Sequence, residues 1–208
     1  MLTTTARRTQ AERRTSTRHS LLSAATAILV ERGLTATTTT EVARVAGLSQ
    51  GALFKHFASK AELLAAVAAH LHEELLGAYL DRFHRLNRTN DVGDRLDKAL
   101  RLLWQLFQTD EMAAALELEM NARTDTHLRH SLLPIAERHA SRIRAVAVDL
   151  FPDHASTPTF ARMFDLVLET MHGMALSRCL APNPAHERAL LAHLQMLARA
   201  GLTETGAT

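Results

Sequence analysis

Apolar residues recur at steps of three and four along most of the chain, which is the pattern of amphipathic helices. The first such run spans 17–33, where Leu21, Ala25 and Ile28 share one face. Two short runs follow, and a longer one extends from 59 to about 86. No segment alternates apolar and polar residues over a sustained length, so the sequence predicts helices and no strands.

The second half of the chain continues the same pattern. Polar breaks at 87–94 and 151–158 separate runs predicted to be helices over about 94–108, 111–122, 125–150, 158–180 and 185–200, the third of them capped by Thr124 or Asp125. Only eight glycines and five prolines interrupt 208 residues. The sequence therefore predicts an all-α fold of about nine helices.

Cap and turn residues divide the first third of the chain. Thr38 with Glu41, and Ser59 with Glu62, have the spacing of capping boxes that begin helices. Gly47 ends the helix that begins at Thr38, and Ser49 caps the next one, over 50–56. Two short helices joined by a glycine-containing turn are typical of a helix-turn-helix.

The turn reads GLSQG at 47–51, which also matches G-x-S-x-G, the nucleophile elbow of serine hydrolases. That interpretation needs an apolar strand before Ser49. The preceding residues, TTTEVARVA, instead have the composition of a capped amphipathic helix. The sequence therefore favours a helix-turn-helix over an enzyme, and it predicts no catalytic residue.

Charge is unevenly distributed. Residues 1–60 contain nine Lys and Arg against three Glu, whereas the rest contains 15 basic and 19 acidic residues. A basic first quarter indicates a surface that meets a polyanion, although a solubilising arginine tail is an alternative. The single cysteine, Cys179, excludes an intramolecular disulfide, and the sequence contains no apolar run of membrane-spanning length. Because no apolar stretch follows the first arginines, we expect no signal peptide. We expect a cytoplasmic protein without membrane contact.

The segment LLSAATAILVERGLTATTTTEVARVAGLSQGALFKHFASKAELLAAV resembles the DNA-binding domain of the TetR family of transcriptional regulators. The shared pattern is a helix ending in E-x-G, then T-T, then A-x-x-A-G-L-S-x-G-x-L-aromatic-x-H-F-x-x-K, over about residues 17–67. The chain departs from the family at Phe54, where tyrosine is usual, and at Thr39, where an apolar residue is common. Phe54 lacks the hydroxyl that commonly reaches a phosphate.

A domain division follows from these features. We expect a basic, flexible arm at 1–16, a three-helix helix-turn-helix domain at 17–62, a helical ligand-binding and dimerisation domain at 63–202, and a tail at 203–208. The arginines at 7–18 either enter a minor groove beside the main site or belong to an untethered tail.

The helix after Ser49 is predicted to enter the major groove with its N-terminal half leading. Gln50 can pair with adenine and Lys55 with guanine, while Ala52 and Gly51 permit close approach. Thr38 and Ser49 are explained equally well as helix caps and as phosphate contacts. The predicted DNA-binding residues are Thr38, Thr40, Ser49, Gln50, Gly51, Ala52, Phe54, Lys55, His56 and Lys60.

The resemblance also implies that the last two helices form a dimer interface, and that the region before them encloses a small-molecule pocket. For the residues of the interface and of the pocket alike, the alternative is that they form an intramolecular core. The predicted interface consists of Phe160, Phe164, Val167, Leu168, Met171, Met174, Leu190, Leu191, Leu194 and Leu197. The predicted pocket consists of Trp104, Phe107, Met112, Leu116, Glu117, Met120, His139, Met171 and His172.

Twelve histidines raise the question of a metal site, but no Cys-Cys or H-E-x-x-H arrangement accompanies them. We expect no metal and no cofactor. The function hypothesis is a transcriptional regulator, a repressor in preference to an activator. It would bind a palindromic double-stranded operator as a homodimer and be released by a small, largely apolar effector. A DNA-binding protein whose C-terminal part only dimerises is the alternative.

Overall fold

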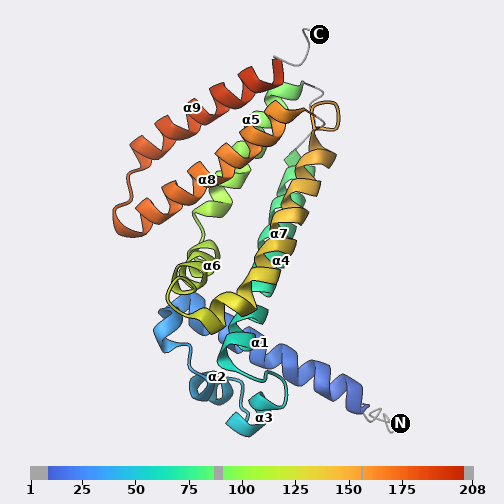
Figure 1. Cartoon of the computed structure of the whole chain (residues 1–208), viewed down its shortest axis with the longest axis vertical. Helices are drawn as coiled ribbons and strands as arrows, with labels where there is room; N and C mark the ends of the chain where they lie inside the picture. Colours follow the sequence, from blue (N-terminus) through green and yellow to red (C-terminus); the bar gives the residue numbers. More distant parts are fainter. Residues whose placement is uncertain (1–8, 87–90, 156, 204–208) are drawn as a thin grey trace, which may run out of the picture.

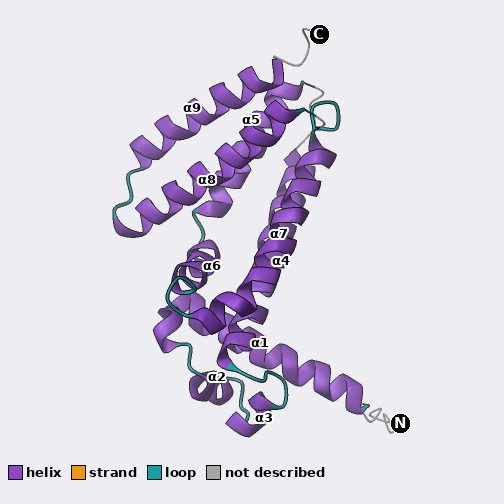
Figure 2. Ribbon diagram, in the orientation of Figure 1, coloured by secondary structure: helices purple, strands orange, loops and turns teal. Residues whose placement is uncertain are grey.

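The computed structural model describes residues 9–86, 91–155 and 157–203, and every regular element in these ranges is helical (Figures 1 and 2). The helices are α1 (Gln10–Ala36), α2 (Thr39–Val45), α3 (Gln50–Phe54), α4 (Lys60–Leu86), α5 (Val92–Phe107), α6 (Asp110–Asn121), α7 (Thr126–Leu150), α8 (Pro158–Leu180) and α9 (Pro184–Thr203). The all-α fold predicted from the sequence is confirmed.

Helices α1, α2 and α3 form one end of an elongated molecule (Figure 1). Their shared core contains Leu21, Leu53, Phe57 and Leu63, all at 0% exposure. Burying side chains of this size contributes about 1.5–3 kcal/mol each, which offsets the poor intrinsic stability of such short helices. The same cluster includes Leu118 of α6, so apolar packing joins this end to the larger helical part.

A second core lies at the other end, where α8 and α9 run antiparallel and pack against α5 (Figure 1). Trp104, Phe107 and Met171 are central to it, together with Phe83 of α4. Helices α4 and α7 form a long pair beside this group. No helix in the described part of the chain is long and apolar enough to cross a membrane.

Helix α1 begins earlier than the sequence pattern predicts. Thr9 accepts a hydrogen bond from the Glu12 amide at 3.2 Å, and the Glu12 carboxylate accepts one from the Thr9 amide at 2.7 Å. This capping box starts the helix at Gln10, because it satisfies two amides of the first turn. Residues 10–16 of the predicted flexible arm are therefore helical, and residues 1–8 lie outside the described residues.

The predicted C-cap at Gly33 and the predicted capping box at Thr38 are each found only in part. Gly33 interrupts α1 with φ 77° and ψ 176°, close to the predicted helix end, and a short helical turn continues to Ala36. Thr38 caps α2 as predicted, accepting from the Glu41 amide at 3.2 Å. The reciprocal half of that capping box is absent, because the Glu41 carboxylate pairs with two arginines instead.

Candidate functional site

The turn between α2 and α3 is built as the sequence predicts. Gly47 has φ 69°, a left-handed conformation that favours glycine. Ser49 follows in extended conformation, and its Oγ accepts a hydrogen bond from the Ala52 amide at 3.1 Å. The residues before this turn form helix α2 instead of the strand that a nucleophile elbow requires. Ser49 is thus the N-cap of α3.

Gln50, the first residue of α3, has a fixed side chain. Its Nε2 donates a hydrogen bond to Thr39 Oγ1, across 2.9 Å, from the start of α3 to the start of α2. In the sequence pattern, Thr39 stood out only as a departure from the apolar residue common at this position. The hydroxyl of Thr39 supplies an acceptor that an apolar side chain lacks, and it orients the amide of Gln50.

Most of the predicted DNA-binding residues lie on one accessible surface around α3. Ala52 and His56 are half-buried, and Phe54 is 46% exposed, so its ring is outside the core. Phe57, by contrast, is fully buried. Besides Phe54, the exposed members of the predicted set are Thr38, Thr40, Ser49, Gln50, Gly51, Lys55 and Lys60.

Arginines of α1 lie beside this surface. The guanidinium of Arg18 lies 4.9 Å from the ring centroid of Phe57. Burial lowers the pKa of His56, and the positive charges of Arg14 and Arg18 lower it further. The early start of α1 therefore places fixed positive charge near α3, where the sequence interpretation expected a flexible arm.

A group of ion pairs joins Arg32 of α1 with Glu41 and Arg44 of α2. Glu41 accepts from Arg32 at 2.6 Å and from Arg44 at 2.7 and 2.9 Å. Hydrogen bonds from Arg44 and then Arg32 lower the pKa of Glu41 to about 2. The bond from Arg32 connects α1 to α2 on the surface of the domain.

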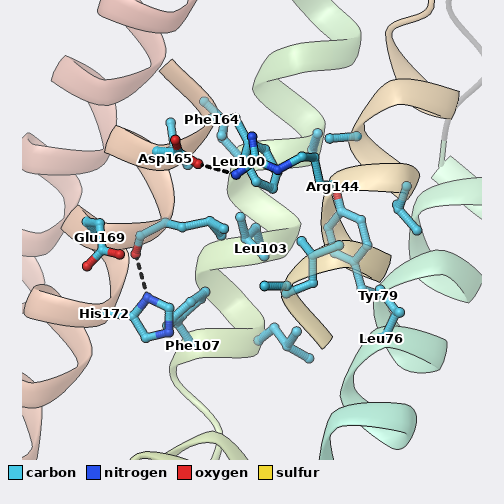
Figure 3. Close-up of a pocket in the computed structure, with 18 of the residues that line it drawn as sticks. Leu76, Tyr79, Leu100, Leu103, Phe107, Arg144, Phe164, Asp165, Glu169 and His172 are labelled. Carbon is cyan, nitrogen blue, oxygen red and sulfur yellow. Dashed lines mark hydrogen bonds and ion pairs between the residues drawn. The ribbon is translucent and has the colours of Figure 1, made fainter. Parts of the chain in front are cut away.

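A cavity of about 500 Å³ lies among α4 to α9 (Figure 3). Apolar side chains make up most of its wall, including Leu100, Leu103 and Phe107 of α5. Its polar residues come from four helices and are His72, Tyr79, Glu119, His139, Arg144, Asp165, Glu169 and His172. A volume of this order suits a drug-sized molecule.

The structure brings five of the nine predicted pocket residues to this wall: Phe107, Met112, Leu116, His139 and His172. The prediction is wrong for the other four. Trp104 and Met171 are buried in the second core, at 5% and 0% exposure, and do not reach the cavity wall. Met120 is 53% exposed, and Glu117 faces α1.

Sequence reasoning missed several polar residues of the wall. Asp165 and Glu169 lie seven and three residues before the predicted His172, so the three share one side of α8, and this spacing could have indicated the two carboxylates. Figure 3 shows them along α8, with Arg144 reaching across from α7 to Asp165. Tyr79 carried no comparable signal, because one tyrosine on an apolar helix face is equally typical of a core.

Two imidazoles stack in the cavity wall. The rings of His72 and His139 are 3.9 Å apart between centroids and 12° from parallel. Burial, and then the neighbouring histidines, lower the pKa of His72 to about 4; burial and His172 do the same for His139. Both rings are therefore neutral at pH 7. No group of three or more metal-ligating side chains occurs in the described ranges.

The predicted dimer interface divides into buried and accessible residues. Val167, Met171, Met174 and Leu194 are buried within the protomer, so they belong to its core and the prediction is wrong for them. Phe160, Leu190 and Leu191 pack against the same core. Phe164 and Leu168 line the cavity, and Leu197 is exposed. Four further large apolar side chains on α8 and α9 are exposed: Leu166, Leu176, Leu180 and Met196.

Residues 21–67 match the family described as "Bacterial regulatory proteins, tetR family". The uncharacterized HTH-type transcriptional regulator Rv2912c of Mycobacterium tuberculosis is 31% identical over 199 residues, covering 94% of this chain and 99% of its own length. The HTH-type transcriptional repressor KstR2 of the same species is 39% identical over 92 residues, 44% of this chain and 41% of KstR2.

Among solved structures, the multidrug binding protein EbrR is similar in fold. In its complex with imidazole it superposes with a TM-score of 0.63 at 23% identity, covering 85% of this chain and 93% of EbrR. A second EbrR structure contains ethidium and superposes with a TM-score of 0.61.

Proposed function

Since this chain belongs to the TetR family and is a DNA-binding transcriptional regulator, we propose that it acts as a ligand-responsive repressor. In this proposal it binds a palindromic operator as a homodimer, and a small, largely apolar molecule in the cavity releases it. The single observation that carries the ligand response is the 500 Å³ cavity beside α6, the helix that contacts α1.

DNA recognition in this proposal uses the surface around α3. Gln50 and Lys55 contact base edges, and Thr38, Thr40 and Lys60 contact phosphates. Arg14 and Arg18 of α1 add positive charge to the same side. The fixed orientation of Gln50 supports this assignment, because a side chain held in place loses less entropy on binding.

Dimerisation in this proposal uses the outer faces of α8 and α9. Of ten exposed large apolar side chains in the described part of the chain, five lie on these two helices. Such clustering marks association surfaces. Two protomers joined there would present two copies of α3 to successive major grooves, which suits a palindrome.

The effector response also draws on two relatives. EbrR is a multidrug binding protein with a structure in complex with ethidium, and KstR2 is a transcriptional repressor. Here, apolar walls of α5 and α8 would bury the body of an effector, and a shift of α6 would reach α1 directly through Glu117. The coupling would then connect two distinct sites through one helix.

A gel-shift assay with the DNA upstream of the protein's own gene tests the proposal. We expect a specific complex that weakens steeply with salt, because phosphate contacts release counterions. Absence of a salt-sensitive specific complex with any promoter fragment would contradict DNA recognition. A specific complex that no cavity ligand weakens would favour the alternative in which the C-terminal part only dimerises.

A further inference from the structure

The charged side chains of the cavity wall are mostly acidic. Glu119, Asp165 and Glu169 contribute three carboxylates, and Arg144 contributes the one positive charge among the lining residues that the structure describes. Arg144 is already engaged, since its guanidinium donates to Asp165 at 2.8 Å and lies 5.3 Å from the ring centroid of Phe164. The carboxylates of Glu119 and Glu169 therefore make the charge at the wall negative.

The stacked histidines add hydrogen-bond acceptors without positive charge. His72 and His139 are neutral at pH 7, because burial disfavours their charged forms. His172 lies with its Nδ1 2.8 Å from the Leu168 carbonyl oxygen, which can only accept. Nδ1 is thus the donor, and in the tautomer whose single proton is on Nδ1 the other nitrogen, Nε2, is an acceptor.

Glu119 lies close to His72 and is affected electrostatically by His172 and Glu169. Its Oε1 lies 4.0 Å from His72 Nε2, and burial raises its pKa, an effect that His172 opposes and Glu169 increases. A cation placed among Glu119, Glu169 and His172 would relieve the repulsion between the two carboxylates. An anion would be repelled by the same two carboxylates, and the Arg144 guanidinium that could offset its loss of hydration already pairs with Asp165.

The remainder of the wall is apolar. Leu75 of α4, Leu100 and Leu103 of α5, and Phe160 of α8 surround the space next to the polar groups. Figure 3 shows Leu103 and Phe107 between the polar residues of α8 and Tyr79 of α4. This combination suits a molecule with one polar end and a hydrophobic body.

We propose that the effector is a hydrophobic amine, protonated at neutral pH, whose ammonium group binds among Glu119, Glu169 and His172. Its N–H groups donate to the two carboxylates and to His172 Nε2, and its body lies among the leucines and aromatic rings. This inference rests on the proposed role of the cavity as the effector site. It goes beyond that role by naming the charge and the hydrogen-bond character of the ligand.

Three probes that share one skeleton test the charge: biphenyl-4-ylmethylamine, biphenyl-4-ylmethanol and biphenyl-4-carboxylate. Isothermal titration calorimetry on the full chain at pH 7.5 measures each affinity. We expect the amine to bind at least tenfold more tightly than the alcohol, and the carboxylate at least tenfold more weakly than the alcohol. A carboxylate that binds as tightly as the amine, or an amine that does not bind, overturns the proposal.

Two isosteric variants locate the ammonium group. Glu119→Gln and Glu169→Gln are each expected to weaken amine binding about fivefold or more, and to leave alcohol binding within twofold. Glu137→Gln, an exposed carboxylate of α7 that does not line the cavity, is the matched control and should change neither. Equal losses for amine and alcohol in the cavity variants would contradict the assignment.

The gel-shift assay distinguishes this inference from the proposed function. If the protein binds its operator and a neutral or anionic compound releases it, the ligand class is wrong and the repressor function stands. If the amine binds the cavity and no specific operator complex forms, the repressor function fails and the ligand assignment stands.

Discussion

The carboxylate of Glu117 on α6 accepts a hydrogen bond from the backbone amide of Leu34, 2.9 Å away at the end of α1. The two residues are 83 positions apart in the chain. The amide is available because Gly33 breaks the helical path just before it. A helix of the C-terminal part thus satisfies a backbone donor of the helix-turn-helix part.

Replacing Glu117 by alanine leaves the Leu34 amide without that acceptor. Because loss of a charged partner to a part-buried donor costs about 1–3 kcal/mol, we expect the free energy of unfolding to fall by that amount. Urea denaturation measures it. Glu137→Ala removes an exposed carboxylate of α7 and should change the value by less than about 0.5 kcal/mol. Equal effects of the two variants would argue against a structural role for the Glu117 contact.

Gly33→Ala tests the same junction from the other side. The backbone conformation at Gly33, φ 77° and ψ 176°, suits only glycine, and a Cβ there would lie 3.3 Å from Glu117 Oε1. We expect a destabilisation of about 1–3 kcal/mol. Gly77→Ala is the matched control, because Gly77 is helical with open space around it. That substitution should instead stabilise by about 0.5–1 kcal/mol, and thermal unfolding compares both.

Thr39 is expected to position Gln50 for base recognition. Gln50→Ala removes the base contact and should weaken operator binding by about 1–3 kcal/mol, with most of the loss at one base pair. Thr39→Val keeps the shape but loses the hydrogen bond, so it should reduce discrimination at that same base pair. Binding titrations against operators with single substitutions measure the pattern. A uniform loss over all positions would assign Gln50 to phosphate contact.

Introducing negative charge on the outer face of α8 should separate the two protomers of the proposed dimer. Leu180 is 92% exposed and Leu176 lies one turn before it. Leu176→Glu combined with Leu180→Glu is expected to yield monomers in sedimentation equilibrium and to weaken operator binding at least tenfold, since one helix-turn-helix then binds alone. Leu133→Glu, on α7 and 55% exposed, is the control and should remain dimeric. A dimeric double variant would place the interface elsewhere.

The stacked histidines should make stability depend on pH. The folded pKa of His72 and of His139, each about 4, is below the ordinary value of 6.5, so the unfolded chain binds more protons between these values. The stability they contribute is present above pH 6.5 and is lost as the pH falls toward 4. The loss is expected to be on the order of 3 kcal/mol for each ring.

His139→Leu should flatten the pH dependence of stability in that window, which urea denaturation at several pH values would measure. Glu119 gives the opposite pH dependence of stability. Because its pKa is raised in the folded protein, the stability that it contributes is lost as the pH rises. His127→Ala, an exposed position on α7, is the control and should leave the slope unchanged. An unaltered slope in His139→Leu would show that other groups govern it.

The sequence by itself determined the helices, the turn and the family. Apolar periodicity depends on contacts three and four residues apart, and Gly47 and Ser49 act on their own backbone, so these signals are local. Cap prediction succeeded for the same reason at Ser49. It failed for the second hydrogen bond of the Thr38 capping box, from the Thr38 amide to the Glu41 carboxylate, because Arg32 from another helix binds that carboxylate.

Only the tertiary structure decided which side chains share a site. Met171 and His172 are adjacent in sequence, yet the first is sealed in the core and the second lines the cavity. A period of 3.6 shows that a helix has an apolar face but not which neighbour covers it. The Glu117–Leu34 bond, the Thr39–Gln50 bond and the His72–His139 stack join residues on different helices, so they arise only when helix packing fixes distances across the chain.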